Sequence, residues 1–402
     1  MSTAPDLSPR PHGVGGTTEE LRRSNLARIL GLVHREGDLS RAELTRLTGL
    51  NRSTIGGLVG ELRELGLVFE SMPESGGSNR AGRPSPIVHA SRQVAAIAVN
   101  PEVDAIHVGL VALGGHVIER VRVETTGSPT SRQVVEMARA AIAGLLAWHE
   151  ADLRIVGVGL AVPGLVRSSD GQVRSADHLG WVDEPLTEMI AEATGYRAVA
   201  ANAAQLGMRA ESVFGAGKGV DDLVYLIGGA SGIGGGVLTG GQLLTGSDGY
   251  AAEFGHTFVQ SGGTLCTCGA NGCFEAEVTQ GALLAAAGLE PNEADQLAER
   301  LGRASDPAVL ALLAHDRELV RIAVKNAVNL FNPRLVVVGG FLAALFGAAA
   351  TSVDGLAGES IVTSRESLQV APALLGPDQL MVGAAELVFS ELLLDPVAIL
   401  SL

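Results

Sequence analysis

A group of soft metal ligands is the part of the sequence with the clearest chemistry. The three cysteines of the chain, Cys266, Cys268 and Cys273, lie within eight residues of one another, and His256 precedes them. One imidazole and three thiolates form the donor set of a closed tetrahedral zinc site, which leaves no open position for a catalytic water. An odd, clustered set of cysteines does not form a disulfide framework. The spacing therefore predicts a structural Zn²⁺ ion, and the alternative is three free thiols beside an unrelated histidine.

These metal ligands lie within a long segment that has the pattern of an α/β body. From residue 93 onward, short apolar runs typical of strands alternate with glycine turns and with helical periodicity. We predict two α/β lobes, residues 93–195 and residues 196–381, with the metal ligands in the second. A closing helix over residues 382–394 is expected to return to the first lobe.

The segment ahead of this body, residues 17–92, has a different pattern. Apolar positions at helical spacing predict a helix over 17–36, and Ser40 and Glu43 have the spacing of a capping box that opens a second, short helix. Asn51 can cap a third helix, and two short strands separated by a loop follow it. This order predicts a winged helix-turn-helix, here called the head, and the alternative is a generic helical bundle.

Two parts of the head have the residues needed to contact DNA. The third helix of a winged helix-turn-helix enters the major groove with its first turns, where Asn pairs with adenine, Arg with guanine or phosphate, and Ser or Thr with either. A basic loop between the two strands can place an arginine in a narrow minor groove, and the alternative for this loop is a solvated linker. The predicted DNA-binding residues are Asn51, Arg52, Ser53 and Thr54 in the helix and Arg80 and Arg83 in the loop.

The distribution of charge allows only the head to approach DNA. The chain carries a net charge of −15, yet residues 1–92 hold twelve arginines against ten acidic residues. The acidic excess therefore lies in the body, which would repel a phosphate backbone. Residues 1–16 are expected to be a disordered tail without the apolar core of a signal peptide, and no apolar run reaches the ~18 residues of a membrane span. We expect a cytoplasmic protein with no membrane partner.

Several motifs of the body resemble one protein family. Residues 252–256 read Ala-Glu-Phe-Gly-His, and residues 266–275 read Cys-Thr-Cys-Gly-Ala-Asn-Gly-Cys-Phe-Glu. Glycine-rich turns lie at 157–164 and 228–236. Together these segments resemble the signature of the ROK family, which holds repressors, open reading frames and sugar kinases. A winged helix ahead of such a body resembles the repressor branch of that family.

The resemblance implies a two-lobed, actin-like ATPase fold of the sugar-kinase kind, with a sugar bound in the cleft and zinc beside it. The family's sugar contacts match Asn202, Glu253, His256 and Glu275 in this chain. Carboxylates suit this role because they accept charge-assisted hydrogen bonds from hydroxyl groups. His256 could bind zinc through one nitrogen and the sugar through the other. The alternative is that Glu253 and Glu275 only support the metal site or cap helices.

The chain departs from the kinases of the family at two places. Their catalytic motif has Asn-Asp, with the Asp as the base, whereas this chain has Asn202-Ala203. Alanine cannot accept a proton. Their first phosphate loop is replaced here by residues 100–104, Asn-Pro-Glu-Val-Asp, which lose an amide donor and gain negative charge. Because phosphoryl transfer depends on positioning and charge stabilisation, we predict that the chain is not an enzyme and has no catalytic residues.

We therefore expect a transcription regulator that acts as a repressor. It would bind an inverted-repeat DNA operator as a homodimer or homotetramer, and a sugar effector would alter that binding. One alternative is a regulator with a vestigial sugar site that is controlled by a sugar phosphate or a partner protein. Another is an active sugar kinase with an accessory head, and a third is a zinc-stabilised scaffold without an effector.

Overall fold

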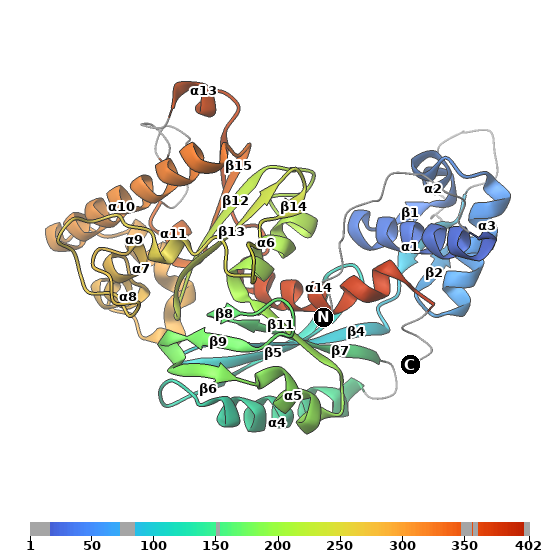
Figure 1. Ribbon diagram of the computed structural model, residues 1–402, viewed down its shortest axis with the longest axis horizontal. Coiled ribbons are helices and arrows are strands. Elements are labelled where there is room, and N and C mark those ends of the chain that lie inside the picture. The colour runs from blue at the N-terminus through green and yellow to red at the C-terminus, as the bar shows by residue number, and fades with distance from the viewer. Residues whose placement is uncertain (1–16, 73–84, 150–152, 347–355, 357–360, 398–402) are drawn as a thin grey trace.

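The computed structural model describes residues 17–72, 85–149, 153–346, 356 and 361–397. It consists of a small head at one side and a larger α/β body, which contains two five-stranded sheets and one small three-stranded sheet (Figure 1). The predicted disordered tail and the loop arginines Arg80 and Arg83 lie outside the described residues.

The head is built from three helices and a three-stranded sheet of order β1-β3-β2. Both predicted helix starts carry capping boxes: the Thr17 and Ser40 hydroxyls each accept a hydrogen bond from the backbone N–H three residues later, at 3.2 Å. The apolar faces of the helices meet in one buried core. The elements are α1 (Thr18–Glu36), β1 (Leu39–Ser40), α2 (Arg41–Thr48), α3 (Arg52–Glu64), β2 (Val68–Ser71) and β3 (Ile87–Ala90).

The first lobe of the body contains a five-stranded sheet of order β11-β7-β4-β5-β6. The strand β11 pairs in parallel with β7, from Ala198 opposite Val158 to Asn202 opposite Val162. Residues 198–202 thus extend the first sheet, although we predicted that the second lobe begins at residue 196. The elements are β4 (Val94–Pro101), β5 (Ala105–Ala112), β6 (His116–Glu124), α4 (Ser131–His149), β7 (Arg154–Val162), α5 (Leu186–Thr194) and β11 (Ala198–Asn202).

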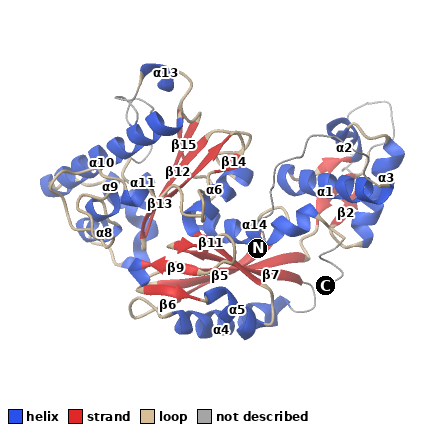
Figure 2. Cartoon of the chain, in the orientation of Figure 1, coloured by secondary structure: helices blue, strands red, loops and turns tan. Residues whose placement is uncertain are grey.

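A small three-stranded sheet, β10-β9-β8, lies beside this lobe (Figure 2). A short 3-10 helix, η1 (Asp177–Leu179), connects two of its strands and turns toward the second lobe. Trp181 follows this helix and fixes it, because its buried indole N–H donates to the Pro129 carbonyl at 2.9 Å. The strands are β8 (Leu165–Val166), β9 (Val173–Ala176) and β10 (Trp181–Glu184).

The second lobe is built on a sheet of order β14-β13-β12-β15-β16, with helices and the cysteine-rich segment packed at its side. Its apolar core joins the sheet to these helices. The elements are β12 (Leu223–Gly229), β13 (Gly232–Thr239), β14 (Gln242–Leu243), η2 (Phe254–His256), α7 (Phe274–Glu277), α8 (Gln280–Ala287), η3 (Pro291–Gln296), α9 (Leu297–Gly302), α10 (Pro307–Phe331), β15 (Leu335–Gly339), α11 (Gly340–Ala344), α13 (Val362–Arg365), β16 (Gln369–Pro372) and η5 (Gly376–Asp378).

Two helices lie where the lobes meet, α6 (Ala203–Phe214) and α14 (Gln379–Leu394). The helix α14 contains the predicted closing helix 382–394 and lies against the strands of the first lobe (Figure 1). Glycine permits this close approach at Gly159, where a Cβ atom would overlap the Ala384 carbonyl group. Another glycine, Gly383, lies equally close to the carbonyl group of Leu206 in α6. The two helices and the first sheet therefore form one tightly packed unit.

The 25-residue helix α10 was not predicted from the sequence. Its buried positions include Leu313, Asp316, Leu319 and Val320, so that a charged residue interrupts the apolar face. No helix in the described ranges, α10 included, combines the length and the apolar character needed to cross a membrane.

The carboxyl group of Asp316 should make stability depend on pH. Its side chain is buried, and neither oxygen has a hydrogen-bond partner among the described residues. Burial raises its pKa from 3.8 to about 6, so the folded state retains the proton to a higher pH than the unfolded state. The contribution of this retained proton to the free energy of unfolding is fully present below pH 3.8 and is lost as the pH rises through about 6.

We therefore expect Asp316→Asn to raise the free energy of unfolding at pH 8 by about 2 kcal/mol relative to the native chain. The gain should disappear near pH 4, where both side chains are neutral. Urea unfolding at the two pH values measures it. An equal effect of the substitution at both pH values would contradict the assignment.

Candidate functional site

The four predicted metal ligands converge in the folded chain. The ligand atoms of His256, Cys266, Cys268 and Cys273 all lie within 4.8 Å of one another. The Cys268 and Cys273 sulfurs are 3.6 Å apart, and the Cys266 sulfur is 3.6 Å from Nδ1 of His256. Ligands at the usual zinc bond lengths of a tetrahedron are separated by about 3.5–3.8 Å. The donor set and its spacing therefore fit a metal ion, and this group of residues could bind one.

The backbone of the cysteine-rich segment holds these side chains in place. A tight turn is closed by a hydrogen bond from the Cys266 N–H to the Ala270 carbonyl at 2.8 Å. Gly272 adopts a φ of +77°, and a Cβ atom there would overlap the Gln260 carbonyl oxygen. Burial raises the pKa of the Cys273 thiol to about 12. A thiol of this kind becomes a thiolate ligand at neutral pH only beside a cation, which is what a metal ion would supply.

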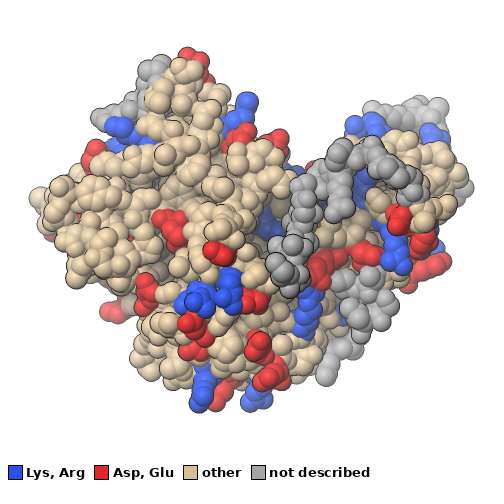
Figure 3. Space-filling model, in the orientation of Figure 1, with Lys and Arg blue, Asp and Glu red and all other residues tan. Residues whose placement is uncertain are grey.

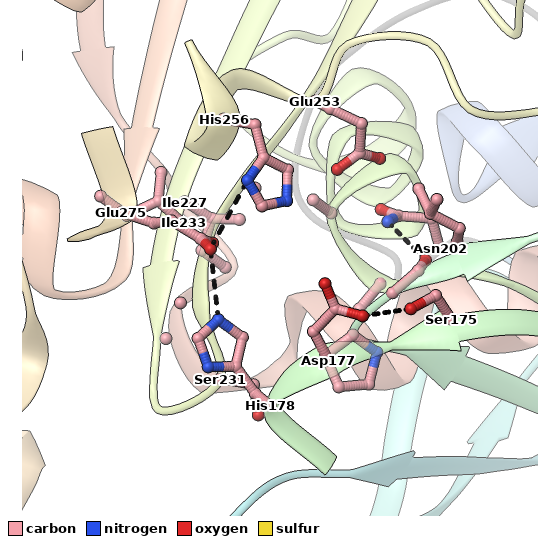
Figure 4. Close-up of a pocket in the computed structure, with 18 of the residues that line it drawn as sticks. Ser175, Asp177, His178, Asn202, Ile227, Ser231, Ile233, Glu253, His256 and Glu275 are labelled. Carbon is pink, nitrogen blue, oxygen red and sulfur yellow. Dashed lines mark hydrogen bonds and ion pairs between the residues drawn. The ribbon is translucent and has the colours of Figure 1, made fainter. Parts of the chain in front are cut away.

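A pocket lies between the two lobes, directly beside the metal ligands (Figure 4). All four residues that the resemblance assigned to sugar contact line it, together with side chains that were not predicted. Ser175, Asp177 and His178 lie in β9 and η1, where no motif marks them, and Leu380 lies in α14. Glu102, Ser231 and Ile233 lie in the motifs at 100–104 and 228–236, which were not assigned to sugar contact. The lining includes Glu102, Ser175, Asp177, His178, Asn202, Ala203, Ile227, Ser231, Ile233, Glu253, His256, Glu275 and Leu380.

The carboxylates of Glu253 and Glu275 give the pocket strong hydrogen-bond acceptors. Burial, and then the nearby charge of Glu275, raises the pKa of Glu253 to about 7. For Glu275, burial acts to raise the pKa, but the hydrogen bond with His178 and the proximity of His256 lower it overall. Glu275 Oε1 lies 3.4 Å from Nε2 of His178 and 3.7 Å from Nδ1 of His256. Because Nδ1 of His256 faces the cysteines, its Nε2 remains for a ligand in the pocket.

The start of α6 forms another wall of the pocket. The Asn202 side chain caps this helix by accepting from the Gln205 N–H at 3.1 Å, and its amide donates to the Gly164 carbonyl at 2.9 Å. Its amide group retains one further N–H for a ligand. The next residue, Ala203, presents only a methyl group to the pocket, at the place where the resemblance puts the catalytic base of the kinases. This wall can orient a hydroxyl group but cannot remove its proton.

The segment 100–104, which replaces the kinases' first phosphate loop, contacts the second lobe. The Ser231 hydroxyl, in the turn between β12 and β13, donates a hydrogen bond to the carboxylate of Glu102. The same hydroxyl accepts from the Val103 N–H at 3.3 Å. Burial raises the pKa of Glu102. These contacts join the two lobes.

The head presents the start of α3 to solvent. Arg52 and Ser53 are exposed, and Arg52 has no ion pair among the described residues. The Asn51 side chain caps α3, accepting from the Thr54 N–H at 2.9 Å and from the Ser53 hydroxyl at 2.7 Å. Arg side chains lie at the top of the head, near α2 (Figure 3). Arg80 and Arg83 lie outside the described residues.

Comparison with known proteins identifies both parts of the chain. A profile of the ROK family matches residues 96–391, and a profile of the MarR family matches residues 27–77. The chain belongs to the ROK family. The predicted two-part architecture, a helix-turn-helix head followed by a sugar-kinase-like body, is thereby confirmed.

Relatives of two kinds share this ROK body. The chain is 26% identical to the xylose repressor of Caldicellulosiruptor bescii over 403 residues, which covers 94% of this chain and 98% of the relative. It is 34% identical to the glucokinase of Thermotoga maritima over 252 residues, which covers 58% of this chain and 77% of the relative. The similarity to a repressor thus covers both the head and the body, as the prediction of a DNA-binding regulator requires.

Solved structures similar to this chain likewise include a ROK regulator and a ROK kinase. A ROK family transcriptional regulator, described as a homologue of the Escherichia coli MLC protein, matches 95% of this chain with a TM-score of 0.74 at 22% identity, which shows that the whole fold is shared. A ROK family glucokinase from Streptomyces griseus, solved with glucose and AMPPNP, matches 73% of this chain with a TM-score of 0.63 at 28% identity.

Proposed function

We propose that this ROK protein is a DNA-binding transcriptional repressor whose body senses an unphosphorylated sugar and transfers no phosphate. The single observation that carries the proposal is the pocket. It retains Glu253, His256 and Glu275 as partners for hydroxyl groups, but Ala203 replaces the kinases' base. The full-length similarity to xylose repressors supports a pentose or hexose effector.

The charge of the pocket favours a neutral sugar over a sugar phosphate. Four carboxylates, those of Glu102, Asp177, Glu253 and Glu275, line it, and no Lys or Arg is among the described lining residues. A phosphate group would enter among these carboxylates without a Lys or Arg to pair with, at a large electrostatic cost. This argues against the alternative in which a sugar phosphate controls the regulator.

Zinc would serve the sugar site rather than catalysis. We propose that Zn²⁺ is held by His256, Cys266, Cys268 and Cys273, which leaves no open coordination position. The bound ion would fix His256 and, through Cys273, the start of α7 that carries Glu275.

For the head, we propose that the start of α3 reads the major groove and that Arg80 and Arg83 contact the minor groove. Binding as a homodimer or homotetramer to an inverted repeat follows from the symmetry expected of such regulators. We place the lobe boundary after Asn202, since β11 belongs to the first sheet.

The proposal is tested by operator binding in the presence of sugars. The purified chain is first used to select an operator from a random library of duplex DNA. The Kd of the protein for this operator is then measured at fixed salt, in the absence and presence of D-xylose, D-glucose and N-acetyl-D-glucosamine. One sugar should change the operator Kd, and Glu253→Gln should weaken that response without changing DNA binding in its absence. A chain that selects no operator, or an operator Kd that ignores every sugar, would refute the proposal.

Restoring the base alone should not create a kinase. We expect Ala203→Asp to show no ATP turnover with any of these sugars, because the segment 100–104 that replaces the kinases' first phosphate loop still carries the carboxyl group of Glu102. ADP release measured with a coupled assay checks this, with a ROK glucokinase as the positive control. Turnover in the native chain would overturn the proposed lack of activity.

A further inference from the structure

The end of α1 in the head is inserted into a buried polar junction with the body. Nε2 of His34 lies 2.7 Å from Oε1 of Glu386 in α14, and both side chains are almost wholly buried, at 0% and 3% exposure. The other ring nitrogen, Nδ1, accepts a hydrogen bond from the Gly114 N–H at 3.0 Å. This acceptor role fixes the hydrogen on Nε2, which therefore donates to Glu386. The carboxylate joins head and body by a buried, charge-assisted hydrogen bond.

Two helices connect this junction to the effector pocket. The helix α6 begins at the pocket with Ala203 and ends with Phe214, whose ring contacts His34 edge-on at 5.3 Å between centroids. The helix α14 contributes Leu380 to the pocket, and Phe389, farther along it, contacts His34 at 5.8 Å. The twelve residues of α6 span about 18 Å. His34 thus contacts the last residue of α6 and the middle of α14, two helices that both start at the pocket.

The two helices are packed too closely to move independently. A Cβ atom at Gly207 of α6 would crowd the Leu380 side chain of α14. A Cβ atom at Gly383 of α14 would overlap the Leu206 carbonyl group of α6. If the first turns of α6 and α14 are displaced, no loose packing is present to absorb the movement. The movement is therefore carried along both helices. Beyond α6, the Lys218 ammonium donates to the Arg35 carbonyl at 2.8 Å, which gives α1 a further attachment.

We propose that α14 and α6 transmit occupancy of the pocket to the head, and that the His34–Glu386 pair is the contact through which the head responds. This inference rests on the proposed function, because it explains how the sensed sugar changes DNA binding. A sugar that displaces Leu380 or the start of α6 would shift the junction and reorient α1, which packs against the recognition helix α3. The pair is a positioning contact and touches neither sugar nor DNA.

Substitutions at the pair separate coupling from folding. Glu386→Leu leaves the His34 N–H buried without a partner. The double variant His34→Leu/Glu386→Leu removes both members of the pair, so that only the Gly114 N–H loses its acceptor. Glu386→Gln keeps an acceptor for His34. The matched control is Asp395→Asn, because Asp395, the C-cap residue of α14, pairs with Arg23 of α1 at 3.2 Å on the exposed side of the same junction.

The experiment uses the full chain, the selected operator and the sugar that gives the largest response. In the native chain we expect the sugar to change the operator Kd by about 10-fold or more. In the double variant the change should fall below about 2-fold, while sugar affinity, measured by calorimetry, stays as in the native chain. Glu386→Gln and Asp395→Asn should retain the response. Hydrogen exchange without sugar should show faster exchange of the α1 amides in Glu386→Leu and no change in α10.

Each outcome decides a different point. A native chain whose DNA binding ignores all sugars refutes the proposed function and this inference with it. A native response that persists undiminished in the double variant refutes the inference alone. Unchanged α1 exchange in Glu386→Leu also refutes it, because the pair would then not anchor the head.

Discussion

Cys273→Ser is expected to release the bound metal and to lower the melting temperature of the chain by about 10 °C. Cys273 is buried, and its sulfur lies 3.6 Å from that of Cys268. Loss of one thiolate from a structural site removes folding free energy, and about 3 kcal/mol corresponds to this shift in a body of this size. Sugar binding should be lost as well, because Cys273 directly precedes α7 and Glu275.

Metal content by mass spectrometry, calorimetric melting and sugar titration measure these effects together. The control is Asn271→Ala, an exposed change in the same segment that removes no metal ligand. It should keep the metal and melt as the native chain does. Native protein that contains no zinc, or a Cys273→Ser variant that melts at the native temperature, would show that the four residues do not form a structural metal site.

Arg52→Ala is expected to weaken operator binding by about 30-fold or more. One contact from arginine to a base or a phosphate is worth about 1–3 kcal/mol, and a symmetric operator would count it twice. The melting temperature should not change, since Arg52 is exposed and has no ion pair among the described residues. Fluorescence anisotropy across a range of salt concentrations measures the effect.

The dependence on salt and sequence shows which contact Arg52 makes. If it binds phosphate, the variant should have a shallower dependence of affinity on salt; if it reads a base, one position in each half-site should lose its preference. Arg63→Ala is the control, because Arg63 is also exposed, at 59%, but lies in the last turn of α3. Equal losses of operator affinity in Arg52→Ala and Arg63→Ala would mean that the start of α3 does not read the DNA sequence.

The local elements of this chain were largely predictable from the sequence. The capping boxes at Thr17 and Ser40 and the spacing of apolar residues act over three or four residues, so their effect does not depend on the rest of the fold. The candidate metal ligands could also be predicted from the sequence, since three of the four lie within one short segment. The ROK resemblance located Glu253 and Glu275 because they flank that segment.

What the sequence did not determine are contacts between distant elements. Asp177 and His178 reach the pocket only because η1 connects two strands of a small sheet beside the second lobe. Residues 198–202 join the first sheet because β11 finds β7 as a parallel neighbour, and no property of those five residues specifies that partner. The sequence also did not reveal that Asp316 is buried within α10.

The junction between head and body shows the same limit most clearly. His34 ends a predicted amphipathic helix and Glu386 lies in a predicted closing helix, yet the two are 352 positions apart. Periodicity reports which face of a helix is apolar, whereas the partner of that face is chosen by packing among all the helices and sheets. The sequence by itself determined the head, the kinase-like body and the candidate metal ligands. Only the tertiary structure decided how the pocket, the metal ligands and the head are joined, because burial and close packing select those contacts.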